Sequence, residues 1–205
     1  MVSGLEGQKL NIAAELPNSI VNGPGARYVI WVQGCPFKCP ECFNPDFQPF
    51  IEKNLVSVEE LADRILSVKD IEGVTYSGGE PMIQAEPLYS LSSLLKKQGL
   101  TILCYSGFTI EQLRLKKYPY VGKLLNQLDI LIDGPYVKDK KANLLWRGSN
   151  NQRVHFMTDA YNDSKLSAEH DTSEMEILVG EEGMTLTGMT HKEIIKRLLK
   201  VVAGG

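Results

Sequence analysis

Three of the four cysteines stand in one short loop, at Cys35, Cys39 and Cys42, a spacing of Cys-x3-Cys-x2-Cys. A cubane iron–sulfur cluster takes one thiolate on each of its irons, so three cysteines leave one iron able to bind another molecule. Thiolates also bind zinc, but a closed structural zinc site needs further paired ligands, and no such pair follows at finger-like spacing. The loop therefore favours a 4Fe-4S cluster with one open iron over a zinc site.

The fourth cysteine, Cys104, closes an apolar segment at residues 100–103. Lone cysteines are among the most often buried residue types, so we expect Cys104 to lie in the core and not to bind the cluster. The sequence has no second group of cysteines, which excludes an auxiliary iron–sulfur centre.

Composition indicates one domain spanning residues 1–205, because 205 residues with 43% hydrophobic content suffice for one well-buried core and are few for two. The first residues have no basic region followed by an apolar run, and no segment reaches the roughly 18 apolar residues of a membrane span. The net charge of −3, without a lysine–arginine block, gives no footprint for nucleic acid. We expect a soluble, cytoplasmic protein with neither a membrane nor a nucleic-acid partner.

Short apolar segments alternate with helical patterns through the middle of the chain. The strands are predicted at residues 27–32, 73–76, 100–105 and 129–133. Helices are predicted at residues 58–68 and 86–98, and capping boxes are predicted at Ser57/Glu60, Thr109/Gln112 and Thr190/Glu193, the last opening an amphipathic C-terminal helix. Residues 174–187 predict a hairpin, so hairpin and helix together occupy about 174–203, and the polar residues 159–173 predict an exposed loop.

Strand and helix in repetition predict an α/β fold with a parallel sheet, and we expect a partial, incomplete TIM-like barrel of parallel strands with outer helices. The cysteine loop, residues 34–44, follows the first predicted strand. Polar segments follow the next three strands at residues 78–80, 104–107 and 133–134. Because parallel α/β folds build their sites at the carboxyl ends of the strands, these segments are expected to form one site.

The cysteine loop resembles the cluster motif of the radical S-adenosylmethionine (SAM) enzymes, and Ser77-Gly78-Gly79-Glu80-Pro81 resembles the segment with which that superfamily binds the methionine amino group. Further segments resemble the anaerobic ribonucleotide reductase activating proteins, at residues 22–25, 131–136 and 146–153. The resemblance implies one 4Fe-4S cluster held by the three loop cysteines, and SAM as the second cofactor.

The same resemblance implies that Gly78, Gly79 and Glu80 bind SAM. The glycines allow close backbone approach, and the carboxylate pairs with the ammonium group. Ser106 and Asp133 are further candidates for cofactor contact, although Ser-Gly and Asp-Gly after a strand are also ordinary turns. Further along, Arg147, Gln152 and Arg153 are candidates to grip the SAM carboxylate or a protein partner, or to form a polar surface turn.

One position departs from the superfamily pattern. Glu41 precedes the third cysteine, where an aromatic residue usually lies against adenine. The ribonucleotide reductase activating proteins often have glycine there, so the departure favours that subgroup.

The resemblance implies a radical SAM activating enzyme that cleaves SAM reductively to a 5'-deoxyadenosyl radical and installs a glycyl radical on a partner. The expected partner is a glycyl radical enzyme, first of all anaerobic (class III) ribonucleotide reductase, and the expected electron donor is a flavodoxin- or ferredoxin-type reductant. Two alternatives stay open. They are a small-molecule radical SAM enzyme such as a 7-carboxy-7-deazaguanine synthase and, more remotely, an iron–sulfur electron-transfer module.

Overall fold

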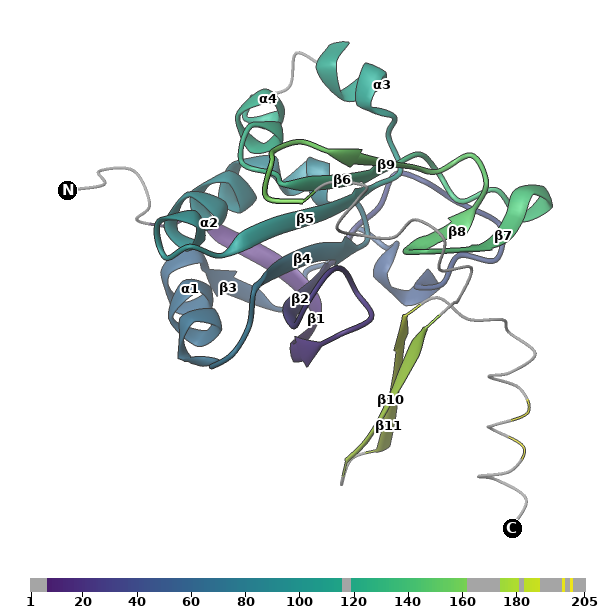
Figure 1. Ribbon diagram of the computed structural model, residues 1–205, viewed down its shortest axis with the longest axis horizontal. Coiled ribbons are helices and arrows are strands. Elements are labelled where there is room, and N and C mark those ends of the chain that lie inside the picture. Colours follow the sequence, from purple (N-terminus) through teal and green to yellow (C-terminus); the bar gives the residue numbers. More distant parts are fainter. Residues whose placement is uncertain are drawn as a thin grey trace.

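The computed structural model describes residues 7–115, 119–161, 174–180 and 183–188, together with Arg197 and Lys200. The strands of its main sheet are β1 (Lys9–Ser19), β2 (Arg27–Val32), β3 (Leu55–Ser57), β4 (Gly73–Gly78), β5 (Thr101–Ser106), β6 (Ile130–Asp133) and β9 (Arg153–Phe156). These seven strands lie in the order β3-β1-β2-β4-β5-β6-β9 (Figure 1).

The four central strands, β2, β4, β5 and β6, are parallel to one another, which confirms the predicted strands and their mostly parallel sheet. Antiparallel strands flank them. β1 pairs with β2 and β3, and β9 pairs with β6. The sequence analysis missed β1 because Pro17 interrupts its apolar alternation, and the register of β1 indeed shifts between Leu16 and Ser19.

Helices follow the strands as α1 (Val58–Ser67), α2 (Ala85–Lys97), α3 (Ile110–Leu115) and α4 (Val121–Leu125), with short 3-10 turns at 45–47, 81–84 and 138–140. The Ser57 hydroxyl accepts the Glu60 N–H at 3.1 Å, as predicted for the start of α1. Thr109 and Gln112 form the complete reciprocal capping box ahead of α3, with bonds of 2.9 and 3.3 Å. The third predicted box, at Thr190, and the C-terminal helix lie outside the described residues.

The two faces of the sheet are covered differently. Alternate residues of the central strands, such as Tyr76, Ile102 and Cys104, pack with α1, α2 and α4 in the main core. Cys104 is fully buried there, as predicted. The residues between them, such as Leu103 and Tyr105, point to the opposite face, where Trp146 packs against the sheet. Figure 1 shows α1 and α2 gathered on one side of the sheet, and this leaves the other face for a site.

Two small hairpins complete the described chain. β7 (Lys141–Leu144) pairs with β8 (Arg147–Ser149), and β10 (Met175–Gly180) pairs with β11 (Gly183–Gly188). The second hairpin confirms the prediction at residues 174–187, whereas most of the predicted loop, residues 162–173, lies outside the described residues. Among the described residues, no helix has both the length and the apolar character needed to cross a membrane.

The segment at residues 22–25 lies at the amino-terminal end of β2, away from the cysteine loop. It folds over the fully buried Arg27, whose Nη1 donates to the Pro24 carbonyl at 3.2 Å. A Cβ on Gly23 would lie 2.6 Å from the Arg27 Cδ atom, so only glycine fits there. Gly23 and Pro24 of this motif therefore serve packing at the amino-terminal end of β2.

Candidate functional site

The cysteine loop leaves β2 and is closed at its base by backbone hydrogen bonds. The Gly34 N–H donates to the Phe47 carbonyl at 2.8 Å, and the Cys35 N–H donates to the Gln48 carbonyl at 2.9 Å. The buried Gln33 amide adds a bond of 2.7 Å to the Pro49 carbonyl. These hydrogen bonds fix the two ends of the loop next to each other, and the three cysteines lie between them.

The Gly78-Gly79-Glu80 segment packs directly on this base. The Glu80 N–H donates to the Gly34 carbonyl at 2.9 Å, and a Cβ on Gly79 would lie 2.2 Å from the same oxygen. Gly78 has a φ of +100°, and a Cβ there would lie 2.6 Å from the Val32 nitrogen. The sequence analysis assigned these glycines to close approach of a ligand, whereas the structure shows that contact between two protein segments already requires them.

One cavity of about 140 Å³ brings most of the predicted site residues together. The three loop cysteines line it, as do the segment 78–80 and Ser106. Gly134, from the predicted segment 133–134, also lines it, and the wall is completed by residues that the sequence analysis did not assign to the site, which include Gln48, Pro135 and Tyr136. Asp133 is absent from the lining residues. The cysteine loop and the ends of β4, β5 and β6 therefore line one cavity, at the carboxyl ends of the parallel strands where the sequence analysis expected these segments to meet.

The cysteine side chains suit a thiolate-bound cluster. All three are partly exposed, whereas Cys104 is buried away from the cavity. Burial, and to a lesser degree the charges of Glu80 and the neighbouring cysteines, raises the pKa of Cys35 to about 11. Iron cations would reverse this repulsion and stabilise the thiolates. Among the described residues, no group of three histidine, cysteine or acidic side chains is close enough together to hold a single metal ion. The three cysteines line the same cavity instead.

Glu80 joins the end of β4 to the end of β5. Its side chain is 1% exposed. One carboxylate oxygen accepts the Ser106 hydroxyl and the Met82 N–H, both at 2.9 Å, and the other accepts the Gly107 N–H at 2.7 Å. Ser106 also accepts the Phe108 N–H at 3.1 Å. These bonds hold a carboxylate in the cavity wall in one orientation.

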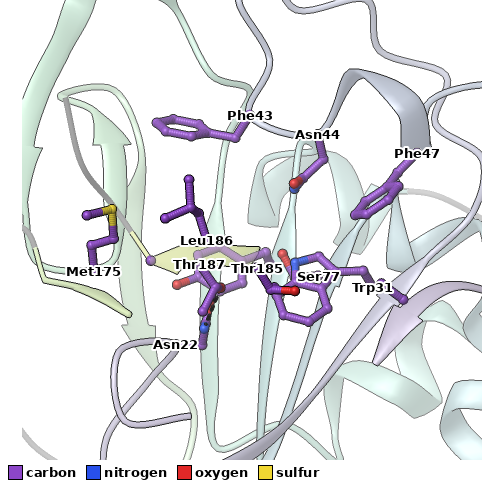
Figure 2. Close-up of a pocket in the computed structure, with 13 residues that line it drawn as sticks. Asn22, Trp31, Phe43, Asn44, Phe47, Ser77, Met175, Thr185, Leu186 and Thr187 are labelled. Carbon is purple, nitrogen blue, oxygen red and sulfur yellow. Dashed lines mark hydrogen bonds between the residues drawn. The ribbon is translucent and has the colours of Figure 1, made fainter. Parts of the chain in front are cut away.

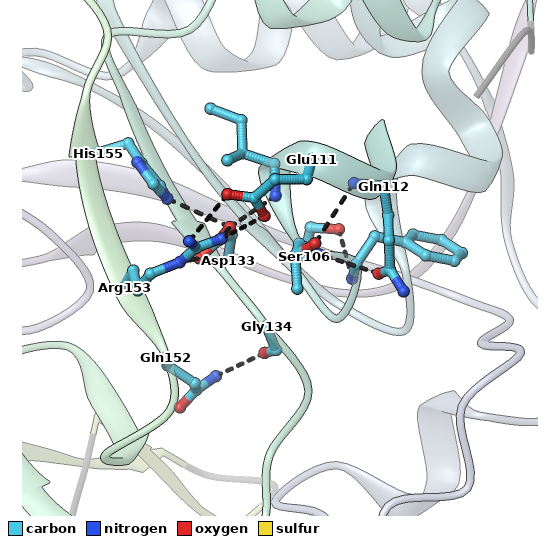
Figure 3. Close-up of polar contacts among 11 residues, drawn as sticks. Ser106, Glu111, Gln112, Asp133, Gly134, Gln152, Arg153 and His155 are labelled. Carbon is cyan, nitrogen blue, oxygen red and sulfur yellow. Dashed lines mark hydrogen bonds and ion pairs between the residues drawn. The ribbon is translucent and has the colours of Figure 1, made fainter. Parts of the chain in front are cut away.

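Asp133 is held differently, at the end of β6. Its carboxylate accepts Arg153 Nε at 3.0 Å and Nη2 at 2.6 Å, and also the Ile110 N–H at 2.6 Å. His155 Nε2 lies 3.2 Å away, and Figure 3 shows Arg153 and His155 pointing toward the Asp133 carboxylate. Burial would raise the pKa of Asp133, but the bonds from Arg153 and Ile110 lower it overall. The structure does not place Asp133 on the cavity, so its predicted contact with the cofactor lacks support from this geometry.

Arg153 reaches a second carboxylate as well. Its guanidinium donates to both oxygens of Glu111, at 2.9 and 2.7 Å. Arg153 thus links β9 to β6 and α3. Both of its ion pairs are within the protein, so its position is explained without a bound ligand. Arg147 is half-buried, and its Nε donates to the Leu145 carbonyl at 3.4 Å.

Gln152 is the member of the segment 146–153 that borders the cavity. Its amide nitrogen donates to the Gly134 carbonyl at 3.2 Å, while its oxygen accepts the N–H groups of Gly148 and Ser149. The neighbouring Asn151 donates to the Pro135 carbonyl at 2.7 Å. The segment therefore braces the chain that leaves β6, which forms one wall of the cavity.

Aromatic and charged contacts close the flanks of the cysteine loop. Phe37 packs against Phe108 with ring centroids 4.7 Å apart, and Phe43 packs against Tyr136 at 5.9 Å. Glu41 pairs with Lys138 at 2.8 Å, and its φ of +58° is a conformation that favours glycine. This backbone conformation gives a physical reason for glycine at the same position in related loops.

A second, larger cavity of about 340 Å³ adjoins the first on the face of the sheet that lacks helices. The two cavities share four lining residues, Phe43, Asn44, Ser77 and Tyr105. Figure 2 shows Phe43 and Asn44 of the cysteine loop on one side and residues 185–187 of β11 on another. The sequence analysis missed this cavity, because the hairpin and the first strands of the sheet are far apart in the sequence and meet only in the folded chain.

Comparison with known proteins shows which family the chain belongs to. A family model described as a 4Fe-4S single cluster domain matches residues 21–155. The anaerobic ribonucleoside-triphosphate reductase-activating protein of Enterobacteria phage T4 is 35% identical over 150 residues, which cover 70% of this chain and 92% of that protein. The chain belongs to this family of activating proteins. The predicted resemblance is thereby confirmed, and with it the 4Fe-4S cluster.

Other members of the activating-protein family give similar coverage. The protein of the same name from Salmonella typhi is 30% identical, over 69% of this chain and 95% of that one, and the Escherichia coli K12 protein is 28% identical, over 72% and 99%. Among solved structures, QueE from Escherichia coli matches with a TM-score of 0.39 and 23% identity, over 50% of this chain and 53% of that chain. The family model ends at residue 155, so the β10–β11 hairpin lies beyond it.

Proposed function

We propose that this protein is a radical SAM activating enzyme that installs a glycyl radical on a partner enzyme, most directly an anaerobic ribonucleotide reductase. The observation that carries the proposal is the cavity in which the three loop cysteines face Gly78, Gly79 and Glu80. When bound, the cluster and SAM supply a 5'-deoxyadenosyl radical, formed with one electron from a flavodoxin- or ferredoxin-type reductant.

The chain's own residues then have separate tasks. Cys35, Cys39 and Cys42 hold the cluster. Glu80 orients the ammonium group of SAM, because its buried carboxylate lies in the cavity wall and charge-assisted hydrogen bonds are the strong ones. The aromatic pair of Phe43 and Tyr136 lies beside the cavity and limits the entry of water.

A finer description of the fold belongs to the same proposal. Four parallel strands with helices on one face support a partial barrel, whose inner face is the one bordered by Trp31, Ser77 and Tyr105. The larger cavity on this face adjoins the cofactor cavity and is where a partner's glycine would be presented. Proximity of the two cavities supports direct hydrogen transfer from the glycine α-carbon, because a radical reaction requires the reacting atoms in contact.

The test uses reconstituted, reduced protein mixed anaerobically with SAM and the ribonucleotide reductase of the same organism. A glycyl radical doublet in the electron paramagnetic resonance spectrum, together with 5'-deoxyadenosine, is expected. Cys39→Ala serves as the control that should give neither. Deoxyadenosine without a doublet, combined with turnover of a small pterin-like substrate, would contradict the proposal in favour of a small-molecule enzyme.

A further inference from the structure

The β10–β11 hairpin is held on the body of the protein by polar contacts, some of which are buried. The Glu176 carboxylate accepts the Ser19 hydroxyl at 2.6 Å and the Ile20 N–H at 2.8 Å. On the other strand, the Thr187 hydroxyl accepts the Asn22 amide at 2.8 Å. Ser19, Asn22 and Thr187 are all at most 9% exposed. Because buried polar groups are costly to leave unpaired, these contacts fix where the hairpin sits.

The strand β11 turns its edge toward the larger cavity. Four consecutive residues, 185–188, line that cavity. Side chains of a strand alternate between its two faces, so a strand that presented one face would contribute every second residue only. Among the described residues β11 pairs with β10 alone, so within this part of the chain its other edge has no strand partner.

We infer that the edge of β11 binds the glycine-containing segment of the partner enzyme as an added, extended strand and guides it to the cofactor cavity. This inference rests on the proposed function and names how that function's protein substrate is held. Strand addition suits such a segment, because backbone hydrogen bonds provide the affinity and need no particular side chain. Glycine, which has no side chain, can then approach closely.

Continuity of the two cavities favours a peptide as the occupant. The larger cavity extends from residues 185–188 of the hairpin to Phe43 and Asn44 of the cysteine loop, and these two also border the cofactor cavity. A chain lying along β11 therefore runs from the molecular edge to the site of the reaction. The hairpin itself lies beyond the family match at residues 21–155.

The first test changes the anchor of the hairpin. Glu176→Ala removes the acceptor of Ser19 and Ile20, and we expect the KM for the partner enzyme to rise roughly tenfold or more, with a smaller change in kcat at saturating partner. Glu176→Gln retains an acceptor oxygen and should restore much of the loss. Val179→Thr, on a residue that is 82% exposed on β10, is the matched control and should keep the wild-type KM. Iron content and circular dichroism verify that each variant is folded and loaded.

The second test leaves the protein unchanged. A synthetic peptide that carries the partner's glycine segment should inhibit activation of the intact partner, and the same peptide with N-methylated backbone amides should inhibit at least tenfold less, because methylation removes the donors that pair with a strand edge. Equal inhibition by both peptides, or a wild-type KM in Glu176→Ala, would overturn strand addition while the proposed function stands. A wild-type protein that forms no glycyl radical would overturn the proposed function and this inference with it.

Discussion

The ends of β4 and β6 both carry a buried carboxylate, and the two are used differently. Glu80 is 1% exposed and lines the cavity of the three cysteines, where it accepts bonds from Ser106 and Gly107. Asp133 is fully buried and accepts the guanidinium of Arg153 away from that cavity. An acidic residue at the end of a strand therefore lines the cavity of the cysteines at β4, which supports its proposed role in binding SAM, and holds the fold together at β6.

The largest effect is expected on cluster content, from a change at the contact between Gly79, just after β4, and the base of the cysteine loop. Gly79→Ala places a Cβ 2.2 Å from the Gly34 carbonyl oxygen, so the base of the cysteine loop must shift. We expect reconstitution to yield less than about a fifth of the wild-type iron, because cluster ligands need a fixed loop. Iron analysis and visible absorbance measure this. Gly122→Ala is the matched control, since its Cβ meets no atom within 4 Å, and wild-type iron in Gly79→Ala would refute the packing argument.

The next prediction separates the two carboxylates by ligand affinity. Glu80→Gln removes the charge proposed to face the SAM ammonium, and a charge-assisted pair of about 1.5–3 kcal/mol corresponds to a tenfold to hundredfold loss of affinity. Asp133→Asn should change the affinity by less than about threefold. Calorimetry on the cluster-loaded proteins measures both. Equal losses in the two variants would remove the distinction between β4 and β6.

The stability of the fold, in contrast to SAM affinity, should depend on Asp133. Asp133→Asn weakens a buried acceptor of Arg153 and Ile110, and we expect the free energy of unfolding to fall by about 2 kcal/mol. The measurement is chemical denaturation of the protein without cofactors. In Arg153→Lys, which loses the bidentate contact but keeps the charge, the free energy of unfolding should fall by a smaller amount. An unchanged free energy of unfolding in Asp133→Asn would contradict the structural role.

The pH dependence of the β6 region gives a smaller effect. Hydrogen bonding from Arg153, chiefly, lowers the pKa of the exposed Glu111 from 4.5 to about 2. A carboxylate with a lowered pKa adds stability above its unfolded pKa, and this stability is lost as the pH falls from about 4.5 toward 2. The difference in unfolding free energy between wild type and Glu111→Gln should thus be present at pH 6 and shrink by pH 3. If the difference in unfolding free energy between the two proteins grew as the pH fell, the lowered pKa of Glu111 would be contradicted.

The smallest effect is expected on the flank of the cysteine loop. Glu41→Gly relieves a positive φ but removes the exposed ion pair with Lys138, and the two effects have opposite signs. We expect the free energy of unfolding to change by less than about 1 kcal/mol, and iron content to stay at the wild-type level. Lys138→Ala, which removes the ion pair alone, is the matched control and should be slightly less stable than Glu41→Gly. The reverse order in thermal denaturation would contradict this assignment.

The sequence predicted the parallel strands and the cysteine loop, because both are local patterns. Residues 27–32 form β2 as expected, and the spacing of the cysteines needs no knowledge of distant residues. The difference between Glu80 and Asp133 could not be predicted. Each is an acid after an apolar strand, and only the fold brings Arg153, 20 residues further along the chain, onto Asp133. The antiparallel strand β9, which carries Arg153, was missed for the same reason, since it pairs with β6 through the tertiary structure.

Transfer of hydrogen from the partner's glycine is the most direct test of the account. The partner enzyme is prepared with deuterated glycine, and the 5'-deoxyadenosine formed on activation is analysed by mass spectrometry beside the electron paramagnetic resonance spectrum. The account predicts one deuterium in each deoxyadenosine that accompanies a glycyl radical, because the carbon–deuterium bond of the glycine is the bond that breaks. Deoxyadenosine free of deuterium, formed in step with the radical, would contradict direct abstraction at this site.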